Sequence, residues 1–411
     1  MRSSAESLRA VSGFAELADI LTLTHETADM NTTETLTGTL QGIRIVELAS
    51  IGPVPFGCMM LGDMGADVIR IDRVNPIELG TQSDPRYNIL NRNRRSIALN
   101  LKHSHGLDLA RKLISEADVV IEGYRPGVAE RLGLGSEDCL MLNPQLIYAR
   151  VTGWGQEGPL AKQAGHDINY IALTGLLGMI GQASGPPVPP LNLIGDFGGG
   201  ALYLVVGVLA ALLERNRSGL GQVIDVAMVD GIFSLMSAIF GADARGAWVH
   251  ERESNAVDGG SPFYGVYETL DAKYIALGAI ENRFQQRLAN LLGVTIPHSP
   301  ADYTSLRHEL SQIFRTRTRD DWTALLQNED ICFSPVLDLH EALQHPHNQT
   351  RKVSQKLAGL TQPLPAPRFN RTPSQIKQPP VLPGQHTNEL LTQWGYTKQE
   401  IENFRAAGAI D

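Results

Sequence analysis

Short runs of consecutive apolar residues alternate with helix-like segments through the first part of the chain. Runs that are apolar nearly throughout are typical of strands buried on both faces of a parallel sheet. Pro55 lies between the first two runs and suits the first turn of a helix. The pattern predicts an α/β fold whose parallel sheet is covered by helices. The predicted strands are 43–49, 67–71, 118–122 and 146–152, and the predicted helices are 55–64 and 106–116.

The pattern changes after residue 152, where a stretch rich in Gly and Pro extends to residue 200. A loop-rich stretch of this length indicates function. A Gly-rich turn at 258–261 then introduces a strand pair followed by helices, which predicts a smaller α+β unit. The remaining predicted strands are 222–229, 264–270 and 274–279, and the remaining helices are 201–215, 230–240, 283–292, 303–314 and 397–407.

These changes of pattern predict a chain with a large domain, a small domain and connecting segments. The first residues are rich in Ser, Thr, Ala and Glu and lack a strand pattern, so we expect them to lie outside the core fold. The predicted parts are an extension at 1–39, a large α/β domain at 40–225 that 360–411 completes, linker helices at 226–258, a small domain at 259–345 and a Pro-rich return linker at 346–385.

Composition narrows the possible partners. The chain has 411 residues, is 43% hydrophobic and carries a net charge of -9, with no long basic block. Such a chain is a poor candidate for nucleic-acid binding, and an anionic ligand would need local Arg and Lys. Three distant cysteines without a C-x-x-C pair predict reduced thiols and no zinc site. No signal-peptide pattern is visible, so we expect a cytoplasmic protein. The longest apolar stretch, 201–213, is shorter than the roughly 18–20 residues that span a bilayer, so we expect no membrane partner.

The turn after the first strand does not match a nucleotide-binding loop. It has the sequence A-S-I-G-P-V-P-F-G, and Pro53 and Pro55 remove backbone donors that would cradle a pyrophosphate. Asp72 does follow the second strand, where a dinucleotide fold places a ribose-binding acid. The missing glycine pattern outweighs this acid, and no P-loop motif is present.

Basic residues instead gather around the predicted strand ends. Ligands of open α/β sheets bind outside the carboxyl ends of the strands, and Arg and Lys suit phosphates. Each of these cations could be an ordinary surface charge, but their repeated placement after strands favours a phosphate-rich ligand such as coenzyme A. They are Arg73, Arg92, Arg94, Arg95, Lys102, Arg125 and Arg131.

Candidate catalytic side chains lie in the Gly-rich stretch. The segments G-H-D-I-N-Y and P-L-N-L-I-G-D-F-G-G-G contain His166, Asp167, Asn192 and Asp196. An adjacent His-Asp pair also occurs by chance, but polar residues among Gly and apolar residues favour function. The glycines 198–200, placed before the predicted helix, could present N–H groups to an oxyanion. Glu281 ends an apolar strand and is either a helix-capping neighbour or a catalytic acid.

The chain from about Gly42 to Tyr396 resembles the family III CoA-transferase (CaiB/BaiF-type) superfamily, and within it the α-methylacyl-CoA racemases. General marks of the superfamily are G-I-R-I-V-E-L-A, L-G-D-M-G-A-D-V-I-R-I-D-R and D-V-V-I-E-G-Y-R-P-G-V-A-E-R-L-G-L-G. The pair A-G-H-D-I-N-Y and L-N-L-I-G-D-F-G-G-G is more specific to the racemases. The resemblance implies a Rossmann-like large domain, a smaller α+β domain and an interlocked homodimer with each active site between large and small domains.

The resemblance also implies residue roles. His166, supported by Glu281, would be one acid/base and Asp196 the other, while Asn192 and main-chain groups near Asp167 would bind the thioester oxygen. Asp167 matches the nucleophile of the transferases. The positions implied in CoA binding are Arg73, Leu99, Asn100, Leu101, Lys102, Gly123, Tyr124, Arg125, Arg131, Gly165, Ile168, Asn169 and Tyr170.

Inversion at the carbon next to a thioester needs two acid/base groups on opposite faces, and a His paired with a buried carboxyl group can supply them. We therefore expect a racemase that acts on 2-methylacyl-CoA without a metal or redox cofactor. A CoA-transferase that uses Asp167 as nucleophile is the first alternative. It would not need His166, Asp196 and Glu281 together, and D-G-G-S at 258–261 is a poor version of the transferase glycine loop. A non-catalytic acyl-CoA-binding protein is the second alternative.

Overall fold

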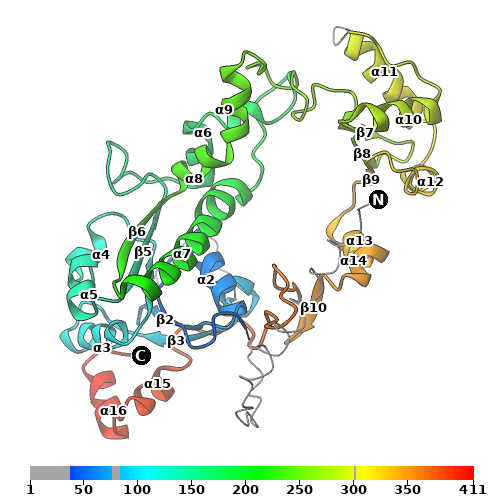
Figure 1. The fold of residues 1–411 in the computed structure, drawn as a ribbon. Coiled ribbons are helices and arrows are strands. Elements are labelled where there is room, and N and C mark those ends of the chain that lie inside the picture. The colour runs from blue at the N-terminus through cyan, green and yellow to red at the C-terminus, as the bar shows by residue number, and fades with distance from the viewer. Residues whose placement is uncertain (1–37, 76–83, 300–301) are drawn as a thin grey trace, which may run out of the picture.

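A computed structural model describes residues 38–75, 84–299 and 302–411, so the extension predicted at 1–39 lies almost wholly outside the described residues. The large domain is built on a six-stranded sheet with the order β3-β2-β1-β4-β5-β6, in which every neighbouring pair is parallel (Figure 1). The strand order reverses direction between β1 and β4, which opens a crevice at their carboxyl ends. The strands are β1 (Arg44–Leu48), β2 (Asp67–Asp72), β3 (Arg94–Ala98), β4 (Val119–Glu122), β5 (Ile147–Thr152) and β6 (Gln222–Ala227).

Helices cover both faces of this sheet, as the apolar strands predict. One face packs against α2 (Pro53–Asp63) and α7 (Tyr203–Ser218), with Cys58 and Leu204 in the shared core. The other face packs against α3 (Ser104–Ser115), α5 (Ser136–Leu142) and two C-terminal helices, α15 (Thr387–Gln393) and α16 (Lys398–Ala406). A short helix, α4 (Val128–Arg131), follows β4. The predicted α/β class with a parallel sheet is confirmed.

The stretch expected to be mostly loop contains a short 3-10 helix, η3 (Leu177–Met179), and two longer helices. They are α6 (Asp167–Leu173) and a π-helix, η4 (Leu193–Leu202), which runs directly into α7. The predicted helix 201–215 therefore begins earlier than expected, because the glycines at 198–200 lie inside the helix and do not form its start. The helix predicted at 230–240 is two helices, α8 (Met228–Leu235) and α9 (Ser237–Ala244).

Among the described residues, the combined helix Leu193–Ser218 is long and apolar enough to cross a membrane by length and composition. Core helices of water-soluble folds pass the same test. Here Leu204, Val208 and Leu212 pack into the core beneath the sheet, which accounts for one apolar face of the helix.

The small domain is a three-stranded antiparallel sheet with helices around one core, and it stands apart from the large sheet (Figure 1). Phe263, Phe314 and Trp322 lie in this core. Its elements are β7 (Tyr264–Glu268), β8 (Tyr274–Gly278), β9 (Phe333–Pro335), α10 (Asn282–Leu292), α11 (Tyr303–Phe314) and α12 (Arg319–Leu326). The chain returns through α13 (Leu339–Gln344), α14 (Pro346–Thr350), β10 (Ser354–Leu357) and β11 (Leu360–Pro363).

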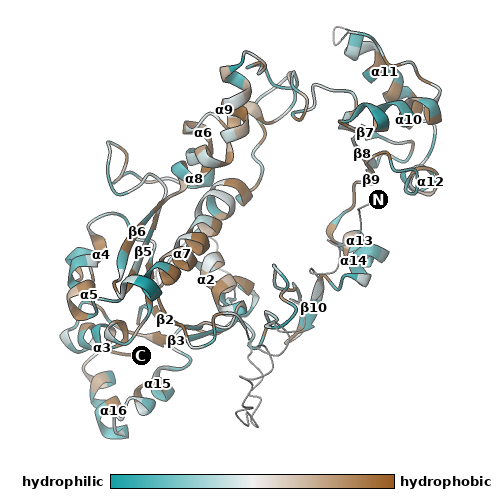
Figure 2. Ribbon diagram, in the orientation of Figure 1, coloured by the Kyte–Doolittle hydropathy of each residue, from teal (hydrophilic) through white to brown (hydrophobic). Residues whose placement is uncertain are grey.

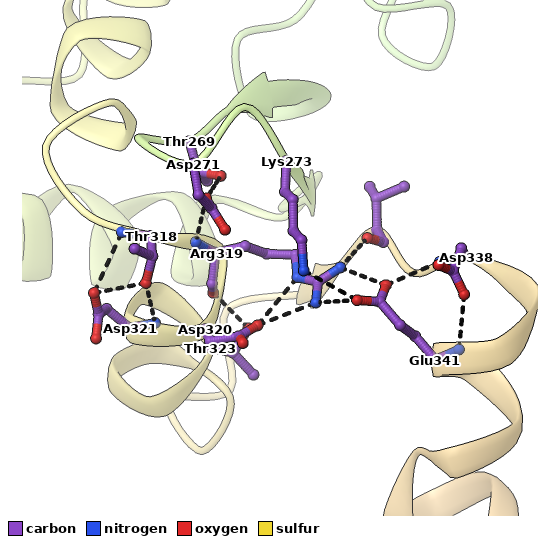
Figure 3. A network of polar contacts seen from close by, with 11 residues as sticks. Thr269, Asp271, Lys273, Thr318, Arg319, Asp320, Asp321, Thr323, Asp338 and Glu341 are labelled. Carbon is purple, nitrogen blue, oxygen red and sulfur yellow. Dashed lines mark hydrogen bonds and ion pairs between the residues drawn. The ribbon is translucent and has the colours of Figure 1, made fainter.

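Arg319 ties the returning chain to the small domain (Figure 3). Its guanidinium donates to both carboxylate oxygens of Glu341 on α13, at 2.7 and 2.8 Å, and its backbone N–H donates to Asp271 beyond β7. Lys273 on the same hairpin also donates to Glu341, at 3.1 Å. Because the Arg319 side chain is nearly buried, this bidentate pair is a stronger tether than an exposed ion pair.

Candidate active site

A cavity of about 600 Å³ lies at the carboxyl ends of the large sheet, at the crevice that the strand order opens. The segments that follow successive strands line it: residues 51–54 after β1, Arg73 after β2, and residues 123–126 after β4. Residues 151–154 at the end of β5, residues 163–166, Asn192 and Asp196 also line it. The cavity thus brings together side chains from the strand ends and from the Gly-rich stretch.

Arg73, Tyr124 and Arg125 form a polar edge of this cavity. Burial raises the pKa of Tyr124, and the neighbouring Arg73 opposes that rise. The loop is held from below by the buried Glu122, which accepts from the backbone N–H of Tyr124 at 2.6 Å and from Arg150 at 3.0 Å. Two arginines that line a cavity can bind phosphate groups.

Other basic residues that the sequence analysis associated with phosphates have different partners. Arg92 pairs with Asp63 at 2.6 Å and Arg94 with Glu47 at 2.6 Å, and all four side chains are buried. Arg95 pairs with Asp67 at 2.7 Å. The interpretation of these three arginines as free phosphate ligands is therefore wrong, because Arg92 links the segment before β3 to α2, and Arg94 and Arg95 link β3 to β1 and β2.

Several residues implied in CoA binding lie outside the cavity lining. Leu99 is buried in the core. The Asn100 side-chain amide donates to the Gly408 carbonyl at 3.0 Å, and its side-chain oxygen accepts from the backbone N–H of Lys102 at 3.1 Å. Gly123, Tyr124, Arg125, Gly165 and Tyr170 do line it. The residues outside the lining are Leu99, Asn100, Leu101, Lys102, Arg131, Ile168 and Asn169.

His166 caps the N-terminus of α6 and faces the cavity. Its backbone N–H donates to the side-chain oxygen of Asn169 at 3.0 Å, which fixes the first turn. Tyr170 packs edge-on against Trp154 with ring centroids 4.8 Å apart, and its hydroxyl donates to the Gly165 carbonyl. Burial raises the pKa of Tyr170 to about 12, so it stays a neutral donor. These contacts hold His166 at the cavity wall.

Asp196 reaches the same cavity from the first turn of η4. Its carboxylate accepts from the Asn192 amide at 3.2 Å. Burial raises the pKa of Asp196, and the charge of Asp167 raises it further, whereas the Asn192 hydrogen bond and His166 lower it. A carboxyl group whose pKa is raised keeps its proton up to a higher pH than an exposed aspartate does.

Asp167 is adjacent to His166 in sequence but turns the other way. It is buried, does not line the cavity, and its Oδ2 accepts from the backbone N–H of Asp196 at 2.8 Å. Its Oδ1 has no hydrogen-bond partner among the described residues. Gly195 leaves room for the Asp167 carboxylate, because a Cβ at Gly195 would lie 2.6 Å from Oδ2 of Asp167.

The glycines at 198–200 do not present free N–H groups to the cavity, contrary to the sequence-based expectation. They allow η4 to cross α8 closely, since a Cβ on Gly199 would meet the Met228 carbonyl at 2.9 Å and one on Gly231 would meet the Gly199 carbonyl at 2.0 Å. The crossing seats η4, and with it Asp196, against the rest of the domain.

Glu281 does not reach the cavity within one chain. It is exposed at the N-terminus of α10 in the small domain. The sequence analysis also missed residues that line the cavity, among them Gly52, Trp154 and Met228. Trp154 lies in the motif V-T-G-W-G-Q, where an aromatic residue between glycines after a buried strand was the available signal. Within the described ranges, no three His, Cys, Asp or Glu side chains are grouped as metal ligands.

The chain belongs to CoA-transferase family III, whose family model matches residues 40–387. It is 43% identical over 371 residues to "Alpha-methylacyl-CoA racemase" of Mus musculus, covering 88% of this chain and 95% of that protein. It is 39% identical over 383 residues to "Alpha-methylacyl-CoA racemase" of Homo sapiens, covering 90% and 97%. A crystal structure of a CaiB/BaiF family protein from Brucella suis matches with a TM-score of 0.76 and 26% identity, covering 87% of this chain and 99% of that one.

Proposed function

We propose that this protein interconverts the (R)- and (S)-epimers of 2-methylacyl-CoA thioesters. The observation that carries the proposal is the arrangement of three side chains. His166 and Asp196 both line the cavity, while Asp167 is turned away and bonded to the backbone of Asp196. The similarity to two α-methylacyl-CoA racemases supports the same reaction.

The reaction needs one group to remove the α-proton and another to return a proton on the opposite face. In one direction neutral His166 takes the α-proton, the electron pair moves onto the thioester carbonyl as an enolate, and protonated Asp196 supplies the new proton. In the other direction the roles exchange. The raised pKa of Asp196 favours the protonated form that this step requires. Asn192 and main-chain N–H groups at the start of α6 are the donors that would stabilise the enolate oxygen.

The polar edge of the cavity suits the CoA part of the substrate. Arg73 and Arg125 would bind phosphate groups, and Tyr124 lines the same cavity. The proposed proton transfers use only side chains of this protein, and coenzyme A is part of the substrate. A cytoplasmic location remains a prediction from the sequence.

We also propose that the protein is a homodimer in which Glu281 supports His166 of the other subunit. Within one chain Glu281 lies at the N-terminus of α10 in the small domain and does not line the cavity. Apolar residues recur along α7, α8 and α9 (Figure 2). Several of their large side chains are exposed, including Val206 at 62%, Leu213 at 67% and Phe240 at 54%. Large exposed apolar side chains that recur on neighbouring helices are typical of a face that a second subunit covers.

A CoA-transferase that uses Asp167 as nucleophile is a second candidate. The observation in its favour is the buried Oδ1 of Asp167, which has no partner among the described residues. The two candidate functions differ in whether the reaction needs a free carboxylic acid as the acceptor of CoA. The racemase should convert a single-epimer 2-methylacyl-CoA to a mixture of epimers, measured by chiral chromatography, without any free carboxylic acid. The transferase would leave the epimer unchanged and move CoA only when an acid is added, through an adduct on Asp167 that hydroxylamine cleaves.

The dimer can be tested by subunit mixing. A His166→Ala chain and a Glu281→Gln chain should each be weakly active alone. Mixed dimers should regain activity, because one site then combines intact His166 with intact Glu281. Absence of complementation in dimers shown by mass spectrometry to be mixed would contradict an active site shared between subunits.

A further inference from the structure

We infer that Phe56 is a positioning residue that sets the place of Asp196 through an aromatic stack, an inference that rests on the proposed two-base reaction. The Phe56 ring on α2 stacks on the Phe197 ring of η4, with centroids 4.4 Å apart and planes 16° from parallel. Phe197 is the residue directly after Asp196. Neither ring lines the cavity, so Phe56 acts on Asp196 and not on the substrate.

The stack lies at a close crossing of α2 with η4 and α7. A Cβ on Gly57 would meet the Leu204 side chain at 2.7 Å, and a Cβ on Gly200 would meet Pro53 at 2.9 Å. At the start of α2, a Cβ on Gly52 would lie 3.3 Å from the Asp196 carboxylate. Small residues thus let α2 approach η4 and α7 closely. The aromatic pair is a large side-chain contact that fixes the position of η4 along α2.

η4 needs such support because of its geometry. A π-helix has wider turns than an α-helix and is found mostly as short stretches at functional sites. The Asp196 end of η4 is held at the backbone by Asp167 and at its side by Phe56. Loss of the stack would leave the hydrogen bond in place but allow the Asp196 carboxylate to shift relative to the substrate. A displacement of about 1 Å can cost on the order of 100-fold in rate.

The consequence differs for the two substrate epimers, which separates positioning from a general loss of stability. Exchange of the α-proton with solvent needs only the base on that face. Displacing Asp196 should therefore slow exchange from the epimer whose proton Asp196 removes, and leave exchange from the epimer that faces His166 largely unchanged. KM for the thioester should change little, because the substitution leaves in place Arg73 and Arg125, the cavity residues that would bind the CoA part.

The test measures deuterium exchange from each epimer separately in the wild-type dimer and in Phe56→Leu, Phe197→Leu and the double variant. We expect either single change to slow deuterium exchange from one epimer about 10- to 100-fold more than exchange from the other. The double variant should add little further slowing, because both single changes remove the same contact. Phe56→Tyr, which keeps a stacking ring, should retain most of the rate. Phe404→Leu is the matched control, since Phe404 on α16 packs against Tyr396, which lies between α15 and α16.

Equal slowing of both epimers by Phe56→Leu, or a profile like that of Phe404→Leu, would overturn the inference while leaving the proposed function intact. If Phe56→Leu does not fold, Phe197→Leu and Phe56→Tyr give the same comparison. A wild-type protein that exchanges neither epimer would instead overturn the proposed function and the inference with it.

Discussion

Asp167 Oδ2 accepts a hydrogen bond from the backbone N–H of Asp196 at 2.8 Å. The position that the family resemblance assigns to a transferase nucleophile is thus occupied by a carboxylate that holds the proposed second acid/base in place. Burial raises the pKa of Asp196, and the negative charge of the neighbouring Asp167 raises it further.

This relationship predicts a pH effect for Asp167→Asn. The amide keeps an oxygen that can accept from the Asp196 N–H but removes the charge that raises the pKa of Asp196. The pKa of Asp196 should fall, so its ionised form should persist to lower pH. The acidic limb of the kcat/KM profile should therefore move to lower pH, with the rate at neutral pH falling less than about 100-fold. A limb that stays in place would show that Asp167 does not influence the proton carried by Asp196, and complete loss of activity would favour the transferase.

Asp196→Asn should affect the two epimers unequally. The amide cannot accept the α-proton, so exchange from the epimer that faces Asp196 should fall about 100- to 10,000-fold. Exchange from the epimer that faces His166 should fall much less. Separate solvent-exchange assays on each pure epimer check this, and equal, mild effects on both would contradict the assignment of two bases.

Arg73→Gln should weaken binding of the CoA part without changing the chemical step. Loss of a charge-assisted hydrogen bond to a phosphate costs roughly 1.5–3 kcal/mol, so KM should rise about 10- to 100-fold while kcat stays nearly constant. The KM of the wild-type protein should also increase with salt more steeply than that of the variant. Arg405→Gln, at a pair with Glu402 on α16, is a matched control and should leave KM unchanged.

Arg319→Met should loosen the small domain and not the large one. The change removes the guanidinium that lowers the pKa of Glu341 well below its usual range. Because the pKa of Glu341 is lower in the folded state than in the unfolded state, the pair stabilises the fold at any pH above the ordinary glutamate pKa. This stabilisation is lost as the pH falls to the pKa of the folded state. Hydrogen exchange at neutral pH should therefore rise in α12 and α13 while the large sheet stays protected. Uniform exchange across both domains would show that Arg319 has no local role.

The sequence predicted the central strands because burial on both faces produces continuous apolar runs. β3 escaped prediction because its sequence, R-R-S-I-A, begins with two arginines. Arg94 is fully buried only because Glu47, on β1, pairs with it. Such a pairing between distant positions has no local signature, so a buried polar strand resembled a surface segment.

Glycines misled the prediction for the site in a similar way. Those at 198–200 suggested a loop and a helix start, but they lie within η4 because α8 passes too close for a Cβ. The candidate residues His166 and Asp196 could be named from the sequence and the family resemblance. The contacts that place them, including Phe56 on Phe197 and Asp167 on the Asp196 backbone, depend on packing between separate elements and could not be predicted.

The most direct test of the two-base racemase is proton NMR of a single-epimer 2-methylacyl-CoA incubated with the protein in deuterated water, with no acceptor acid. We predict that the α-proton signal disappears while the other epimer appears, both carrying deuterium at the α-carbon. Retention of the α-proton and of the original epimer until a free carboxylic acid is added, followed by transfer of CoA to that acid, would contradict the account.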